Sequence, residues 1–264
     1  MGELHAQFSP DAEFSDVVIR VHHPPITLPE GTLFTDYRLH CVILSRHSRF
    51  FQRILTGPCR TAFQGCCGRG PRPAHDLKDA TTPTNVIEIH EEKPVYFDAM
   101  IQHMYEGSYK LCEAQSGAEE IQTVVTHVGI YKTAQKYDNI GLQSFSVQAV
   151  TELLAELASS SKANPYASDC VYEMVAIKAA CEKFYNMATK TKSAMGRVIA
   201  SPCCACDDLV GALEFEEMLK EKPTLAVDIL LHINTTKPSC QEIQRRFKAV
   251  TVREVLKEPL SRKI

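Results

Sequence analysis

The sequence lacks the long apolar runs that would carry it across or into a membrane. No stretch approaches the roughly 18 uncharged apolar residues of a membrane-spanning helix, and even the apolar run 225–233 is interrupted by Asp228 and His232. The first twenty residues contain four acidic side chains and no apolar centre of a signal peptide. We therefore predict no secretion and no membrane partner, and we expect an intracellular protein of the nucleus or cytoplasm.

The sequence also lacks an excess of charge of either sign. Its 264 residues carry a net charge of -3, so the composition gives no sign of neutralising a nucleic-acid backbone. The most basic segment, 245–263, is interrupted by Glu254 and Glu258, which is typical of a solvated helix end. We predict no nucleic-acid partner.

A recognisable catalytic set is missing as well. No histidine has the glutamate spacing of a zinc protease, no serine stands in a glycine-flanked elbow, and the glycines do not form a phosphate-binding loop. Four histidines that could serve in catalysis or metal binding lie in four different predicted elements: His40, His103, His127 and His232. The sequence predicts no enzyme, no cofactor and no small-molecule substrate.

Cysteine, in contrast, is abundant. Without a secretory signal, the eleven cysteines are predicted to remain thiols. Cys203 and Cys206 have the spacing of a zinc-ligand pair, but no second pair stands nearby, and a metal ion would need Cys66, Cys67 or a distant histidine. A zinc- or redox-responsive protein that uses the Cys203–Cys206 cluster is one alternative. Our prediction is that these are surface or loop thiols without a metal, so that Cys203→Ser leaves folding intact. Cys170 and Cys181 are instead predicted to pack in a core.

The N-terminal half predicts strands followed by helices. Short strands are expected at 16–21 and 32–39, joined by a loop as a hairpin-like pair, and then a helix pair begins at His40 and Ser48. Ser48 is predicted to cap the helix that ends before Gly57-Pro58, and His40 to hydrogen-bond free backbone groups at the joint between strand and helix. The glycine- and proline-rich segment at about 59–84 is predicted to be a mobile insertion.

A third strand is predicted at 85–90, followed by a helix from Pro94 to Gly107. Two further helices with apolar faces are predicted at about 121–131 and 142–157, with Gly141 in the joint between them. After a polar boundary at 159–165, a helix capped by Ser168 or Asp169 and helices at 209–219 and 223–232 predict an all-helical C-terminal region. The predicted fold class is α+β, with a small sheet flanked by helices and a helical region behind it.

Several short motifs follow one another in a distinctive order. They are Ser15-Asp16-Val17, His40 before Val42-Ile43-Leu44, Ser48 with Phe50-Phe51, 86–89 (Val-Ile-Glu-Ile), Phe97 with 104–109, and 131–138 with Gly141-Leu142. In order and spacing they resemble the BTB (POZ) domain family. The resemblance covers 14–158 apart from the insertion, and the C-terminal region, 166–264, is similar to that of fungal single-BTB-domain proteins.

The resemblance implies a non-enzymatic protein–protein interaction module, an adaptor that binds a partner protein or itself, for example as a homodimer. It also implies an alternative, the substrate adaptor of a cullin-type ubiquitin ligase. Cullin-binding members often carry a glutamate two residues after a hydrophobic one, but here Phe63 is followed by Gln64-Gly65, and Cys41 stands where corepressor-binding members have an arginine. The expected partner-binding residues are Asp16, Cys41, Phe63, Tyr105 and Tyr109, and the expected structural residues are His40, Ser48, Gly107 and Gly141.

Overall fold

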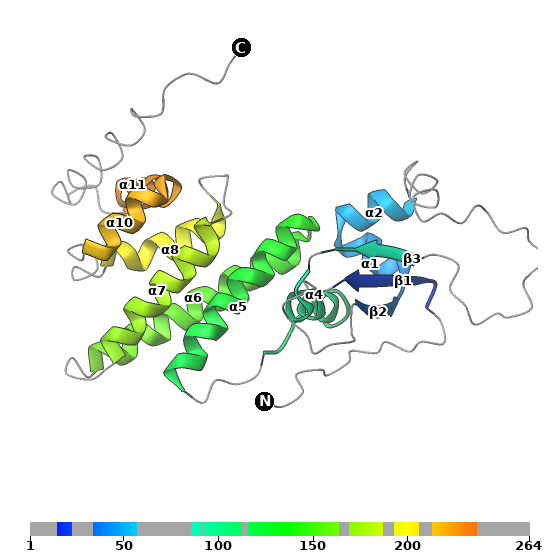
Figure 1. Cartoon of the computed structure of the whole chain (residues 1–264), viewed down its shortest axis with the longest axis horizontal. Helices are drawn as coiled ribbons and strands as arrows, with labels where there is room; N and C mark the ends of the chain where they lie inside the picture. The colour runs from blue at the N-terminus through cyan, green and yellow to red at the C-terminus, as the bar shows by residue number, and fades with distance from the viewer. Residues whose placement is uncertain are drawn as a thin grey trace, which may run out of the picture. The chain divides into compact units, whose positions relative to one another are not determined.

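We describe a computed structural model over residues 15–22, 34–56, 86–90, 92–111, 116–163, 169–186, 193–205 and 213–236 (Figure 1). Within these ranges the chain forms a small mixed sheet and helices, which confirms the predicted α+β class. The strands are β1 (Val17–His22), β2 (Phe34–Leu39) and β3 (Val86–Ile89). The helices are α1 (Cys41–His47), α2 (Arg49–Thr56), α4 (Pro94–Glu106), α5 (Gly117–Lys136), α6 (Ile140–Ala163), α7 (Asp169–Tyr185), α8 (Ala194–Ala205), α10 (Leu213–Glu221) and α11 (Pro223–Thr236). The predicted insertion at 59–84 lies outside the described residues.

By the packing of its backbone the chain divides into two compact units. The first comprises Met1–Leu111 with Lys132–Phe145, and the second comprises Cys112–Tyr131 with Ser146–Ile264. Helices α5 and α6 therefore contribute residues to both units. The boundary predicted at 159–165 falls inside the second unit.

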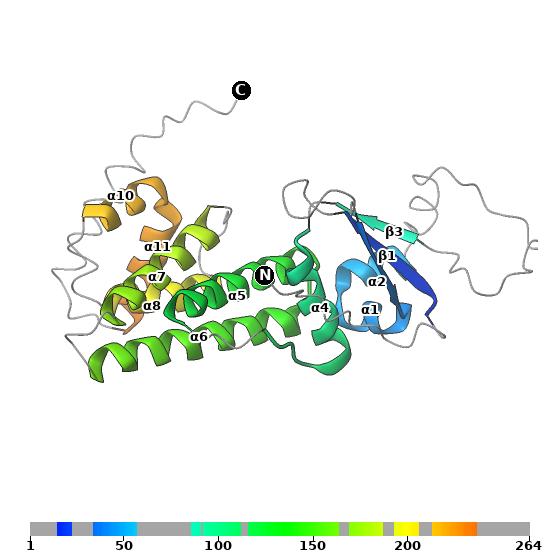
Figure 2. The ribbon, with the colours of Figure 1, turned by 60° about the horizontal axis from the view of Figure 1, so that its bottom comes forward.

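The sheet of the first unit has the strand order β2-β1-β3. Strands β1 and β2 pair antiparallel, as the predicted hairpin requires, and β3 pairs parallel to β1 with Val21 opposite Ile89. Alternate side chains point to opposite faces of a strand. One face is buried, through Val17, Ile19, Val21, Tyr37, Leu39, Ile87 and Ile89. Helices α1 and α2 lie beside the sheet in both views (Figure 1, Figure 2).

The core of the first unit is built around aromatic rings. The rings of Phe51 and Tyr137 stack with centroids 5.5 Å apart, and Phe97 meets Tyr137 edge-on at 6.0 Å. Tyr37 packs on Phe97 and donates its hydroxyl hydrogen to Asp98 Oδ1 at 2.5 Å. Burial raises the pKa of Tyr37, and the nearby Asp98 raises it further, so this hydroxyl stays a donor. These rings hold together α2, α4 and the turn that follows α5.

The predicted ends of α4 are confirmed. Pro94 occupies the first turn, where its missing N–H is not needed. Gly107 ends the helix in the left-handed conformation, with φ 75°, and donates its N–H to the His103 carbonyl at 2.9 Å. Glycine reaches this conformation without steric cost.

The core of the second unit is helical. It is formed by apolar side chains of α5, α6, α7, α8, α10 and α11. The predicted helices at 209–219 and 223–232 are confirmed as α10 and α11 within the described residues. Helix α8 was not predicted, because Gly196 and Pro202 inside it are helix breakers by propensity. None of the helices in the described part of the chain is both long enough and apolar enough to cross a bilayer.

One prediction about the cysteines is wrong. Cys203 is not a surface or loop thiol: it lies in α8, is fully buried, and directs its thiol to the Ile199 carbonyl at 3.2 Å. Burial and the neighbouring Cys181 thiol raise the pKa of Cys203, with the Cys181 hydrogen bond as the larger cause. Cys181 is buried as predicted. Cys203 therefore behaves as a core residue.

Candidate interaction surface at the start of α1

Asp16 and Cys41, both expected near a partner surface, are joined by a hydrogen bond. The Cys41 amide, which is the first of α1, donates to Asp16 Oδ1 at 2.7 Å. The Asp16 amide in turn donates to the Leu39 carbonyl at 3.2 Å, at the end of the β1–β2 pairing. A carboxylate suits this position because the first amides of a helix have no partner within the helix and carry partial positive charge. Asp16 thus fixes the start of α1 from another segment of the chain.

His40 and Tyr105 form the second pair at this point. The His40 amide donates to the Tyr105 hydroxyl oxygen at 3.0 Å, and His40 Nδ1 lies 2.9 Å from the same oxygen. The hydroxyl can accept the first bond and donate the second when Nδ1 carries no proton. The His40 ring makes no cap bond to α1 and contacts the Tyr105 hydroxyl, so the bond predicted from this ring to a free backbone group is not seen among the described residues.

Burial raises the pKa of Tyr105, with smaller contributions in the same direction from nearby Asp16 and Cys41 and an opposing one from the His40 amide. The hydroxyl therefore stays protonated and able to donate. Because Asp16 and Cys41 affect the pKa of Tyr105 through their charges, both lie close to its hydroxyl. Three of the five expected partner-binding residues are thus brought together.

An exposed apolar side chain adjoins this group. Val42 follows Cys41 in α1 and is 73% exposed, the largest exposed fraction among the large hydrophobic residues of the described chain. Asp16 is also exposed, whereas Cys41 and Tyr105 are half-buried. We call Asp16, Cys41, Val42 and Tyr105 the α1 surface. It offers an exposed apolar side chain one residue after the amide that donates to the Asp16 carboxylate.

Two other expected partner-binding residues do not belong to it. Tyr109 is only 5% exposed, and its ring packs on Phe145 with centroids 4.9 Å apart. It is a core residue, which corrects the expectation of a partner contact. Phe63 lies outside the described residues.

The remaining expected structural residues have identifiable roles. Ser48 Oγ accepts the Phe51 amide at 3.1 Å, which confirms the predicted cap of α2, and donates to the Tyr137 carbonyl at 2.5 Å. Gly141 lies in the first turn of α6, where an added Cβ would be 3.2 Å from His103 Cε1. In the joint before it, Asp138 has φ 52° and Asn139 Oδ1 accepts the Leu142 amide.

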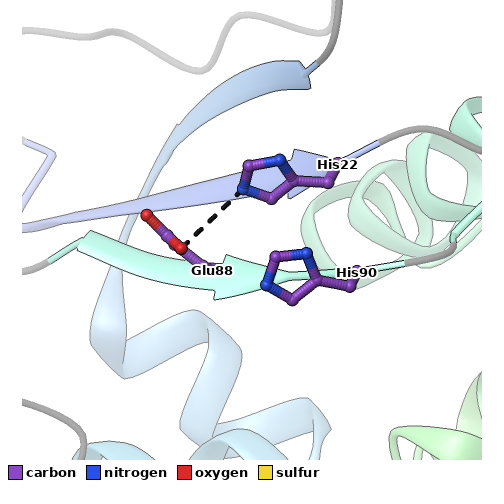
Figure 3. Close-up of side chains that lie close together, drawn as sticks. All are labelled: His22, Glu88 and His90. Atoms are coloured by element: carbon purple, nitrogen blue, oxygen red, sulfur yellow. Dashed lines mark ion pairs between the residues drawn. The ribbon is translucent and has the colours of Figure 1, made fainter. Parts of the chain in front are cut away.

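A further group of side chains, which could bind a metal ion, was not predicted from the sequence. His22, Glu88 and His90 converge on the exposed face of the sheet, with their possible ligand atoms within 4.8 Å of one another (Figure 3). His22 is far from Glu88 and His90 along the chain and meets them because β3 pairs with β1. Glu88 and His90 are two residues apart in the strand predicted at 85–90, and this spacing is the only part of the arrangement that the sequence could have indicated.

No protein-family model matches this chain, and no curated protein matches it in sequence.

Proposed function

We propose that this chain is a non-enzymatic protein–protein interaction module of the BTB (POZ) type, which binds a partner protein or a second copy of itself through the α1 surface. The observation that carries the proposal is the exposure of Val42 beside a hydrogen-bonded polar group. An apolar side chain in this setting gains free energy when a partner removes it from water, by roughly 1.5–3 kcal/mol for full burial of a valine-sized side chain.

The polar neighbours of Val42 support binding in a second way. The Asp16 carboxylate already accepts the Cys41 amide of α1, and His40 and Tyr105 are already bonded to each other. A partner therefore has few side chains to immobilise, and each flexible side chain that must be ordered at an interface costs about 0.5–1.5 kcal/mol. The exposed carboxylate adds a group that selects a basic or hydrogen-bond-donating partner.

The alternatives gain no support from the described residues. The cullin-adaptor alternative depends on the segment around Phe63, which lies outside them. The zinc- or redox-responsive alternative depends on Cys203, whose thiol is buried against the Ile199 carbonyl rather than offered to an ion.

The proposal is tested by affinity purification of the tagged full chain from the cells that make it, together with a second copy that carries a different tag. Val42→Asp places a charge at the most exposed apolar position of the α1 surface without disturbing a buried contact. Val175→Asp is the matched control, because Val175 is 44% exposed on α7 in the second unit. Both variants are first shown to fold by circular dichroism.

We expect a partner protein, or the second copy, to be recovered with the wild type and with Val175→Asp, and to fall at least tenfold with Val42→Asp. Equal recovery with all three proteins would place any binding surface elsewhere. A measured turnover of a small molecule by the purified chain would contradict the non-enzymatic part of the proposal.

A further inference from the structure

We propose that His22, Glu88 and His90 form a binding site for a transition-metal dication, with Zn²⁺ as the best match. The three side chains lie on the exposed face of the sheet: His22 at the end of β1, Glu88 in β3, and His90 directly after β3. This site is separate from the α1 surface and independent of the function proposed for it.

The register of the sheet brings the three residues together. Because β3 pairs parallel to β1, Arg20 lies opposite Glu88 and Val21 opposite Ile89, so the chain direction carries His22 next to His90. Their imidazole rings are stacked, with centroids 4.4 Å apart and planes 20° apart. Both rings and the Glu88 carboxylate reach out over the same part of the sheet (Figure 3). Sites on strands hold their ligands more precisely than sites on loops.

The atoms that would meet the ion are not engaged in strong bonds. His22 Nε2 is shielded from solvent and makes no hydrogen bond to the described residues. It lies 3.8 Å from Glu88 Oε2, which is too long for a hydrogen bond. Two ligands on a tetrahedral zinc ion with bonds of 2.0–2.1 Å stand roughly 3.3 Å apart. The three groups therefore need only close in by side-chain rotation to hold one ion.

The donor set selects the kind of ion. Two imidazoles and one carboxylate match the zinc sites that keep a fourth position open, whereas Mg²⁺ and Ca²⁺ prefer oxygen ligands. The partial exposure of all three residues leaves room for water in the fourth position. The site would thus bind Zn²⁺ with three protein ligands and one exchangeable ligand.

The cation opposite Glu88 on the neighbouring strand is already paired with a carboxylate. Arg20 is held by Asp36 through two hydrogen bonds of 2.8 Å, and its guanidinium lies 4.3 Å from the ring centroid of Phe34. Among the described strand residues, Arg38 is a second cation on this face, beside the pair of Arg20 and Asp36, and Glu88 is itself one of the ligands. Affinity therefore has to come from the ligand bonds themselves, which makes it sensitive to removal of any one ligand.

The test is titration of ZnCl₂ into metal-stripped full-length protein by isothermal titration calorimetry, under reducing conditions. His22→Asn and His90→Asn each remove one ligand, and Glu88→Gln removes the carboxylate at an exposed position. His47→Asn, in α1, is the matched control that removes a histidine of the same unit away from the site. We expect the wild type and the control to show one zinc-binding event, and we expect the affinity of that event to be at least tenfold weaker in each of the three ligand variants. In chelator, the unfolding midpoints of the three variants should equal that of the wild type.

Because the chain has eleven cysteines, a second readout identifies the ligands. Co²⁺ is added to the wild type and to the double variant His22→Asn/His90→Asn, and the spectrum of the variant is subtracted from that of the wild type. The difference should show the visible bands of an ion bound by nitrogen and oxygen, and no thiolate charge-transfer band in the near ultraviolet. Equal zinc isotherms for the wild type and the double variant would overturn the site. A difference spectrum dominated by thiolate charge transfer would overturn it as well, by placing the ion on cysteines.

Discussion

At the scale of single residues, burial decides what a reactive side chain does. Cys203 and Cys206 have a zinc-like spacing, but Cys203 is enclosed in the helical core and its raised pKa keeps the thiol protonated. His22 and His90 carry no motif, yet they converge with Glu88 on an open face. The spacing of residues along the chain predicts neither the burial of Cys203 nor the convergence of His22 with His90, because both depend on how elements pack in the folded protein.

Cys203→Ser is now expected to destabilise the second unit by about 1–3 kcal/mol, because a hydroxyl replaces a weakly polar thiol within an apolar cluster. Urea unfolding followed by circular dichroism measures the loss. Cys41→Ser, at a half-buried position of the first unit, serves as the control and should shift stability by less than about 0.5 kcal/mol. If the two variants were equally stable, Cys203 would not have the core role described here.

At the scale of elements, a helix can be predicted from the sequence when the residues that begin and end it agree with its pattern of apolar residues. Helix α4 has proline in its first turn, glycine after its last and buried Phe97, Met100 and Met104 between them. Helix α8 contains Gly196 and Pro202, so propensity argues against it and only the surrounding core shows why it forms. Gly196 is needed there, because an added Cβ would lie 2.4 Å from Asp228 Oδ2.

The candidate sites were predictable to different extents. Asp16, Cys41 and Tyr105 were expected from the family resemblance and do come together, although Val42, their most exposed neighbour, was not among the expected residues. The pairing of β3 with β1 could not be read from the sequence, because strand register between distant segments is set by the whole core. The histidine site that depends on this pairing was missed for that reason.

Two substitutions on α4 test the first unit's core. Phe97→Asp should unfold that unit, because Phe97 is fully buried among aromatic rings and removal of a buried phenylalanine alone costs about 3–5 kcal/mol. Val95→Asp, on the same helix but 40% exposed, is the matched control and should be tolerated. Near-ultraviolet circular dichroism reports the aromatic packing directly. A native spectrum for Phe97→Asp would contradict the described core.

At the scale of the whole molecule, the described structure combines an α+β unit that carries both candidate sites with a helical unit whose core is continuous over six helices. The helical unit contains buried groups that respond to pH. Burial lowers the pKa of His127 to about 4. His127 therefore stays neutral in the folded protein at pH values where the unfolded chain binds a proton.

Stability should consequently be full above the ordinary histidine pKa of about 6.5 and should decline as the pH falls from there toward 4, because protons favour the unfolded chain in that window. The contribution of His127 amounts to about 2 kcal/mol at pH 5. In the wild type the free energy of unfolding should fall between pH 7 and pH 5. In His127→Gln this fall should be smaller by about 2 kcal/mol. An unchanged difference would show that His127 does not titrate as described.

The most direct test of the central claim, that the α1 surface is where this protein binds, is the dissociation constant of the purified full chain for the partner or second copy recovered with it. Isothermal titration calorimetry should give a Kd at least tenfold larger for Val42→Asp than for the wild type, and an unchanged Kd for Val175→Asp. The same Kd for all three proteins would contradict the claim.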